Sequence, residues 1–103
     1  MHARLSRFAG LPPERIYSTI EQFKQGALPQ FEQLDGYRGV LIAVNQAEGK
    51  AAAITFWESQ DNMRQSDRLA DQARQAALEQ AQGSSEPTRE PIVDHYEVVL
   101  DQR

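Results

Sequence analysis

Three side chains are the candidates for chemistry in this sequence: Trp57, His95 and Tyr96. Trp57 is the only tryptophan and closes an apolar run, so its indole face could stack on a flat aromatic ligand or shape the entry to a pocket. The imidazole of His95 suits proton transfer near neutral pH. The phenol of Tyr96 could donate a hydrogen bond to a phenolate or quinone oxygen. Together these groups indicate proton transfer and oxyanion stabilisation on an aromatic substrate.

Each candidate also has a structural alternative, which is the more common role for its residue type. Trp57 can be a core or interface tryptophan, His95 can lie at a surface or a dimer contact, and Tyr96 can pack at an edge. The only other histidine is His2, far away in the sequence, and the chain has no cysteine. Because this pattern lacks metal-ligand spacing, we expect no metal site.

A pocket is predicted beside Trp57, where small side chains would leave space. Alternate residues of a strand share one face, so Ala53 and Thr55 lie on the side of Trp57. Counting the same alternation back through the preceding strand adds Leu41 and Ala43. The helices that cover this face would supply the rest, unless their apolar side chains fill the space. The predicted pocket comprises Trp57, Ala53, Thr55, Leu41, Ala43, Tyr17, Phe23 and Met63.

Length and composition predict one globular domain spanning residues 1–103, because 40% of the residues are hydrophobic and 25% are charged. The net charge is −4 and the basic residues are scattered, which argues against nucleic acid as a partner. No run approaches the ~20 apolar residues of a membrane span, and the first residues lack the apolar centre of a signal peptide. We therefore expect a cytoplasmic protein without a membrane segment.

The elements that must position these residues follow the order β-α-β-β-α-β. Strands are predicted over 2–9, 37–45, 50–58 and 92–100, and helices over 13–25 and 60–82, with a short turn that begins at Pro29. Gly26 would close the first helix and Ser59 would cap the second. Residues 83–91 have the glycine, serine and proline content of a loop. This order predicts an α+β, ferredoxin-like fold with one antiparallel sheet and both helices on one face.

The central hairpin is apolar on both faces, which predicts a partner for the face without helices. Val40, Ile42 and Ile54 fall in one alternating set, and Leu41, Ala53 and Trp57 fall in the other. Neither set could be left to water. We therefore expect a homodimer that forms through the sheet faces.

Three motifs resemble one protein family. They are DGYRG at residues 35–39, before the second strand, FWES at 56–59, at the end of the third, and YEVV at 96–99, in the last strand. With almost the whole chain, they are similar to the antibiotic-biosynthesis-monooxygenase-like family of dimeric α+β barrels. The resemblance implies the ferredoxin-like fold and the dimer.

The resemblance also bears on activity and cofactor. The haem-degrading branch uses an Asn on the first strand and a His on the helix after the Trp, whereas this chain has no Asn before Asn45 and no His between Trp57 and His95. The quinone-forming branch has an Asn four residues before its Trp, where this chain has Ala53. We therefore expect no haem. The expected function is cofactor-independent oxidation of a small aromatic or quinol substrate, and the alternative is a non-catalytic ligand-binding or structural dimer.

Overall fold

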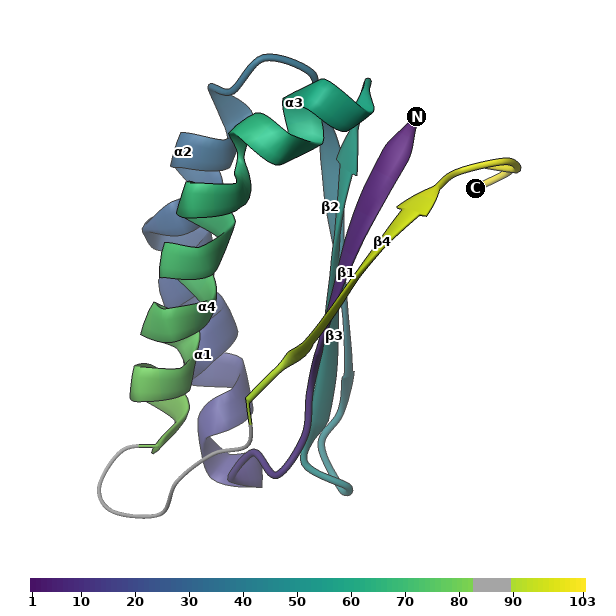
Figure 1. The fold of residues 1–103 in the computed structure, drawn as a ribbon. Coiled ribbons are helices and arrows are strands. Elements are labelled where there is room, and N and C mark those ends of the chain that lie inside the picture. Colours follow the sequence, from purple (N-terminus) through teal and green to yellow (C-terminus); the bar gives the residue numbers. More distant parts are fainter. Residues whose placement is uncertain (83–89) are drawn as a thin grey trace.

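A computed structural model describes residues 1–82 and 90–103 of the chain. Its helices and strands form two layers, a sheet and a layer of helices (Figure 1). The elements in chain order are β1 (His2–Phe8), the 3-10 helix η1 (Pro13–Arg15), α1 (Ile16–Gln25), α2 (Ala27–Glu32), β2 (Tyr37–Asn45), β3 (Lys50–Trp57), α3 (Gln60–Gln65), α4 (Asp67–Gln82) and β4 (Ile92–Glu97). Residues 83–89 of the predicted loop lie outside the described residues.

The sheet has the strand order β2-β3-β1-β4, and each neighbouring pair is antiparallel. The helices all cover one face of it, as Figure 1 shows. This arrangement confirms the predicted α+β, ferredoxin-like fold. Among the described residues, no helix is both long enough and apolar enough to cross a membrane.

The predicted helices are broken where short-range hydrogen bonds compete with the helical pattern. The first begins as the single turn η1 before α1. The second is divided at Ser66, whose hydroxyl donates to the carbonyl oxygen of Met63 at 2.6 Å and whose amide donates to the same oxygen at 3.1 Å. The N-cap prediction is confirmed, because the hydroxyl of Ser59 accepts a hydrogen bond from the amide of Asn62 at 3.1 Å.

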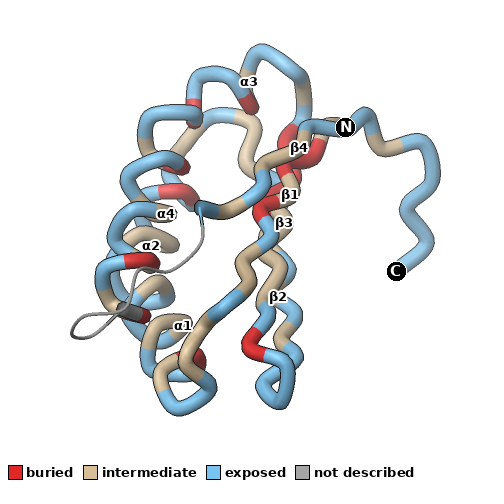
Figure 2. The backbone as a smooth tube through the Cα atoms, turned by 60° about the horizontal axis from the view of Figure 1, so that its bottom comes forward, coloured by how far each residue is buried: buried red, intermediate tan, exposed pale blue. Residues whose placement is uncertain are grey.

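The core lies where α2, α3 and α4 meet the end of β3. Its buried members are Phe31, Trp57, Met63 and Ala70, and the burial is visible along the backbone in Figure 2. Trp57 has no exposed surface. Its ring centroid lies 6.1 Å from that of Phe31 and 5.7 Å from that of Tyr37, which meets it edge-on.

The face assignment of the central hairpin corrects the sequence prediction. Ile42 lies opposite Ala53, and Leu41 lies opposite Ile54. An even-numbered residue of β2 therefore shares a face with an odd-numbered residue of β3, so a single alternation cannot run through both strands. Ile42 and Ala53 face the helices, whereas Leu41 lies on the open face of the sheet and is 46% exposed.

The C-terminal residues 98–103 follow β4 and extend away from the helices (Figure 2). The guanidinium of Arg103 lies 4.2 Å above the ring centroid of Phe56, a residue on the open face of the sheet. Val99 and Leu100 in this tail are 86% and 78% exposed. The open face and the tail thus share one side of the molecule.

Candidate functional site

A cavity of about 100 Å³ lies between the sheet and the helices. The strands contribute residues from β1, β2 and β3, namely Arg4, Ser6, Phe8, Val40, Ile42, Ala51, Ala52, Ala53 and Thr55. Apart from Leu11, which precedes η1, the remaining wall comes from the helices and consists of Ile16, Thr19, Ile20, Phe23, Phe31, Ala70, Ala73, Arg74, Ala77 and Ala81. Most of these side chains are apolar, so the cavity would favour an apolar ligand.

Alanines create the space. Ala70, Ala73 and Ala77 recur along one side of α4 at the three- and four-residue spacing that places side chains on one helix face. Ala51 and Ala53 oppose them from β3. Methyl side chains on both layers leave a gap that larger residues would close.

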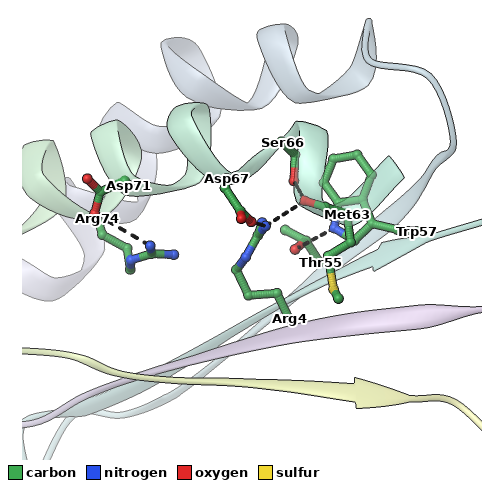
Figure 3. Close-up of polar contacts among 8 residues, drawn as sticks. All are labelled: Arg4, Thr55, Trp57, Met63, Ser66, Asp67, Asp71 and Arg74. Carbon is green, nitrogen blue, oxygen red and sulfur yellow. Dashed lines mark hydrogen bonds and ion pairs between the residues drawn. The ribbon is translucent and has the colours of Figure 1, made fainter. Parts of the chain in front are cut away.

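Two arginines are the charged residues of the wall. Arg4 on β1 is 3% exposed, and its Nη2 atom donates to the carbonyl oxygen of Met63 at 2.8 Å and to the carboxylate of Asp67. The Nη2 atom of Arg74 on α4 lies 3.6 Å from the Asp71 carboxylate. Figure 3 shows both guanidinium groups between α4 and the sheet. The Nη1 atom of each is buried and has no hydrogen-bond partner among the described residues.

Burial also affects ionisation at the site. It lowers the pKa of Arg4, an effect that the hydrogen bond and the charge of Asp67 oppose and the positive charge of Arg74 reinforces. Next to the core, burial raises the pKa of Tyr37, and the negative charge of Glu32 adds to this rise. Within the described residues, no cluster of three or more His, Asp or Glu could hold a metal ion.

The structure places three of the predicted pocket residues in the cavity wall: Ala53, Thr55 and Phe23. Trp57 and Met63 lie next to it in the core and not at the wall. The indole Nε1 of Trp57 donates to the Thr55 hydroxyl at 2.9 Å, as Figure 3 shows. Phe31, which packs on Trp57, and Thr55 both line the cavity. Trp57 therefore lies behind the cavity wall and contacts two residues that line it, Thr55 and Phe31.

The other predicted residues lie away from the cavity. Leu41 and Ala43 belong to the open face because of the hairpin register. Tyr17 is 60% exposed on α1. Of the catalytic candidates on β4, Tyr96 pairs with Ala3 and is 52% exposed, and His95 pairs with Arg4 but is exposed on this edge strand and does not line the cavity.

Sequence reasoning missed both arginines of the wall. Arg74 lies three residues after Asp71, a spacing typical of an ion pair on a solvated helix side, and it contacts Asp71, but the Arg74 side chain is only 16% exposed. Asp67 has the same three-residue spacing from Arg64, but its carboxylate contacts Arg4. A signal for Arg4 was available, because it alternates with Ser6 and Phe8 on one strand face.

Among curated proteins, the chain is similar to two uncharacterised proteins of Mycobacterium tuberculosis, strains CDC 1551 and H37Rv. Each is 27% identical to it over 73 residues, which cover 71% of this chain and 33% of the relative. The matched part thus spans about a third of the length of these relatives. No protein-family model matches the sequence.

Solved structures share the fold at low sequence identity. A protein of Bordetella bronchiseptica, named as a candidate antibiotic biosynthesis monooxygenase, has a TM-score of 0.62 and 20% identity, with 96% of this chain and 97% of that chain covered. A cofactor-independent oxygenase of Streptomyces nogalater has a TM-score of 0.64 and 12% identity, with 97% and 94% covered. A haem degrader of Mycobacterium tuberculosis, with two haems bound in its active site, has a TM-score of 0.67 and 18% identity, with full coverage of both chains. The chain therefore has the antibiotic-biosynthesis-monooxygenase-like fold.

Proposed function

We propose that this protein binds a small aromatic phenol or quinol in the cavity between sheet and helices and oxidises it with molecular oxygen, without a cofactor. The observation that carries the proposal is the apolar cavity with two guanidinium groups in its wall. An apolar wall suits an aromatic ring, and a cationic group at that wall stabilises a phenolate oxygen. A shared fold with a cofactor-independent oxygenase supports the reaction type by analogy.

The proposed reaction balances without another reductant. A phenol with a hydrogen on the ring carbon para to its hydroxyl loses that hydrogen and the hydroxyl proton. One atom of O₂ forms the new carbonyl, and the other leaves as water with both hydrogens, so the products are a quinone and water. All four electrons that O₂ accepts come from the substrate. The protein would hold the phenolate and exclude water from the ring carbon that reacts.

Cavity size argues for a single ring. A cavity of about 100 Å³ is of the same order as the ~150 Å³ apolar cavity that accepts one benzene molecule. Haem is several times larger than one ring, and the wall contains no histidine among the described residues. The proposal accordingly includes no haem.

A non-catalytic binding protein is the second candidate, and the composition of the cavity wall favours it. Among the described residues, the wall contains no His, Asp or Glu that could act as a general base. The catalytic candidate His95 does not line the wall. A protein with this cavity could bind the aromatic ligand and leave it unchanged.

Oxygen uptake with phenol and with 1,3-dihydroxybenzene tests the function, and calorimetry measures the binding of both compounds. The decisive variant is Ala73→Leu, which fills the cavity, and the matched control is Ala76→Leu on the exposed side of the same helix. We expect uptake of one O₂ per quinone formed, lost in Ala73→Leu and kept in Ala76→Leu. Binding without uptake would favour the non-catalytic candidate, and no binding of either compound would refute both.

We also propose that a second copy of the chain covers the open face of the sheet. Leu41 is 46% exposed there, and Val99 and Leu100 of the tail add exposed apolar surface on the same side of the molecule. Exposed apolar side chains on one side of a molecule are typical of an interface. The two cavities would then lie on the outer sides of a sheet-to-sheet dimer.

A further inference from the structure

Two positively charged side chains of the cavity each have an unused hydrogen-bond donor. Arg4 is 3% exposed, and its contacts with Met63 and Asp67 both use the Nη2 atom. The Asp71 contact of Arg74 also uses Nη2. In the described part of the chain, the Nη1 atoms of both arginines are buried without an acceptor.

This arrangement is unfavourable in the unliganded protein. A buried donor of a charged group that lacks a partner costs more than a neutral one. The carboxylates of Asp67 and Asp71 offset the two charges, but their side chains are 59% and 68% exposed, so they lie toward the solvent. Among the described residues, the Nη1 atoms of these two guanidinium groups therefore have no hydrogen-bond acceptor inside the cavity.

We propose that the ligand of this cavity carries an anionic oxygen group, a carboxylate or a phenolate, which accepts hydrogen bonds from the Nη1 atoms of Arg4 and Arg74. The inference rests on the proposed function, in that it takes the cavity as the ligand site, and it names the substrate class: a monocyclic aromatic anion. Its ring would lie among the alanines of α4 and β3 and against Phe23. A planar oxygen anion suits guanidinium groups, which donate along fixed directions.

The ionisation of the site agrees with this assignment. Burial and the charge of Arg74 both lower the pKa of Arg4. A bound anion would act in the opposite direction, because an opposite charge nearby favours the protonated guanidinium. By the same interaction the site would favour the ionised form of a bound phenol.

Benzoate and benzamide test the inference, since they have the same shape and differ in charge. Calorimetry at neutral pH should give benzoate an affinity at least about tenfold higher than that of benzamide, as expected for hydrogen bonds to a charged group. 4-Nitrophenol tests the phenolate arm by its visible absorbance. Its apparent pKa should fall on binding if the site takes a phenolate, and should stay unchanged if the site takes only carboxylates.

Arg74→Met is the decisive variant, because Arg74 is less buried than Arg4 and its loss leaves the contacts of Arg4 with Met63 and Asp67 in place. Arg68→Met, at an exposed position on the same helix, is the control. We expect Arg74→Met to weaken benzoate binding about tenfold and to leave benzamide binding unchanged. Arg68→Met should change neither affinity.

The outcomes separate this inference from the proposed function. Equal affinities for benzoate and benzamide, or equal benzoate affinities of wild type and Arg74→Met, would overturn the inference and leave the cavity as a site for neutral rings. Preferential benzoate binding without oxygen uptake from phenols would support the inference and remove the oxygenase function. If neither benzoate nor benzamide binds, the inference is overturned, and the proposed function is then decided by the measurements with phenol and 1,3-dihydroxybenzene.

Discussion

At the scale of single residues, the only tryptophan of the sequence packs behind the cavity wall and holds residues of that wall in place. Trp57 has no exposed surface and contacts Phe31 and Tyr37. Its indole nitrogen is satisfied by the hydroxyl of Thr55, a residue that lines the cavity. A substitution of Trp57 would therefore affect a bound ligand indirectly, by displacing Thr55 and Phe31.

The Thr55 hydroxyl is predicted to stabilise the fold through this contact. In Thr55→Val the indole N–H of Trp57 would be buried without an acceptor, and we expect a loss of about 1–3 kcal/mol in the free energy of unfolding. Thr55→Ser keeps the hydroxyl and should lose less. Urea unfolding followed by tryptophan fluorescence measures both. Equal stabilities of Thr55→Val and wild type would show that the hydrogen bond contributes nothing.

The sequence predicted part of the candidate site at this scale. Ala53, Thr55 and Phe23 were recognisable because small and apolar residues follow the periods of a strand and a helix. Arg4 and Arg74 were not, because they lie 70 positions apart in the sequence and meet only when β1 packs under α4. From sequence alone, a single arginine is normally predicted to lie at the protein surface.

At the scale of elements, turn length decides which residues share a face. The pairing of Asn45 with Lys50 across the hairpin brings odd-numbered residues opposite even-numbered ones. Both strands are apolar on both faces, so the hydrophobic pattern alone could not reveal the register. Leu41 and Ala43 were misplaced for this reason, although the bounds predicted for β2 agree with the structure.

The segment that leads into β2 depends on a glycine. Gly36 has a φ of +78°, and a Cβ atom there would lie 2.3 Å from the Cγ atom of Asn62. Its carbonyl oxygen also accepts a hydrogen bond from the amide of Glu58 at 2.7 Å. The position thus joins α3, β2 and the end of β3.

Gly36→Ala is therefore predicted to lower the free energy of unfolding by more than about 2 kcal/mol, because the left-handed conformation alone costs roughly 1–2 kcal/mol and the clash adds to it. Gly26→Ala is the matched control, since the φ of Gly26 is −100°, and it should change stability by less than about 1 kcal/mol. Thermal unfolding of both variants tests this pair. A Gly36→Ala protein as stable as Gly26→Ala would contradict the prediction.

At the scale of the whole molecule, the topology was predictable from the sequence, whereas the part of the cavity wall that α4 contributes was not. Four apolar segments and two helical ones in this order favour one compact arrangement, and the strand order β2-β3-β1-β4 is the one that forms. The cavity depends on how closely α4 packs on the sheet, which no local pattern encodes. The alanines of α4 have the same spacing as the apolar stripe of any helix that packs on a core, so the spacing does not distinguish a cavity from close packing.

The last prediction concerns the open face of the sheet. If a second copy covers it, Leu41→Lys places a charge in an apolar interface and should dissociate the dimer, because a buried charge without a partner costs several kcal/mol. The control is Tyr17→Lys, an exposed residue in the helical layer. Light scattering at micromolar concentration should give the mass of two chains for wild type and Tyr17→Lys and of one chain for Leu41→Lys, with unchanged circular dichroism. A wild-type monomer would refute the sheet-to-sheet dimer, and dissociation by Tyr17→Lys alone would place the interface on the helices.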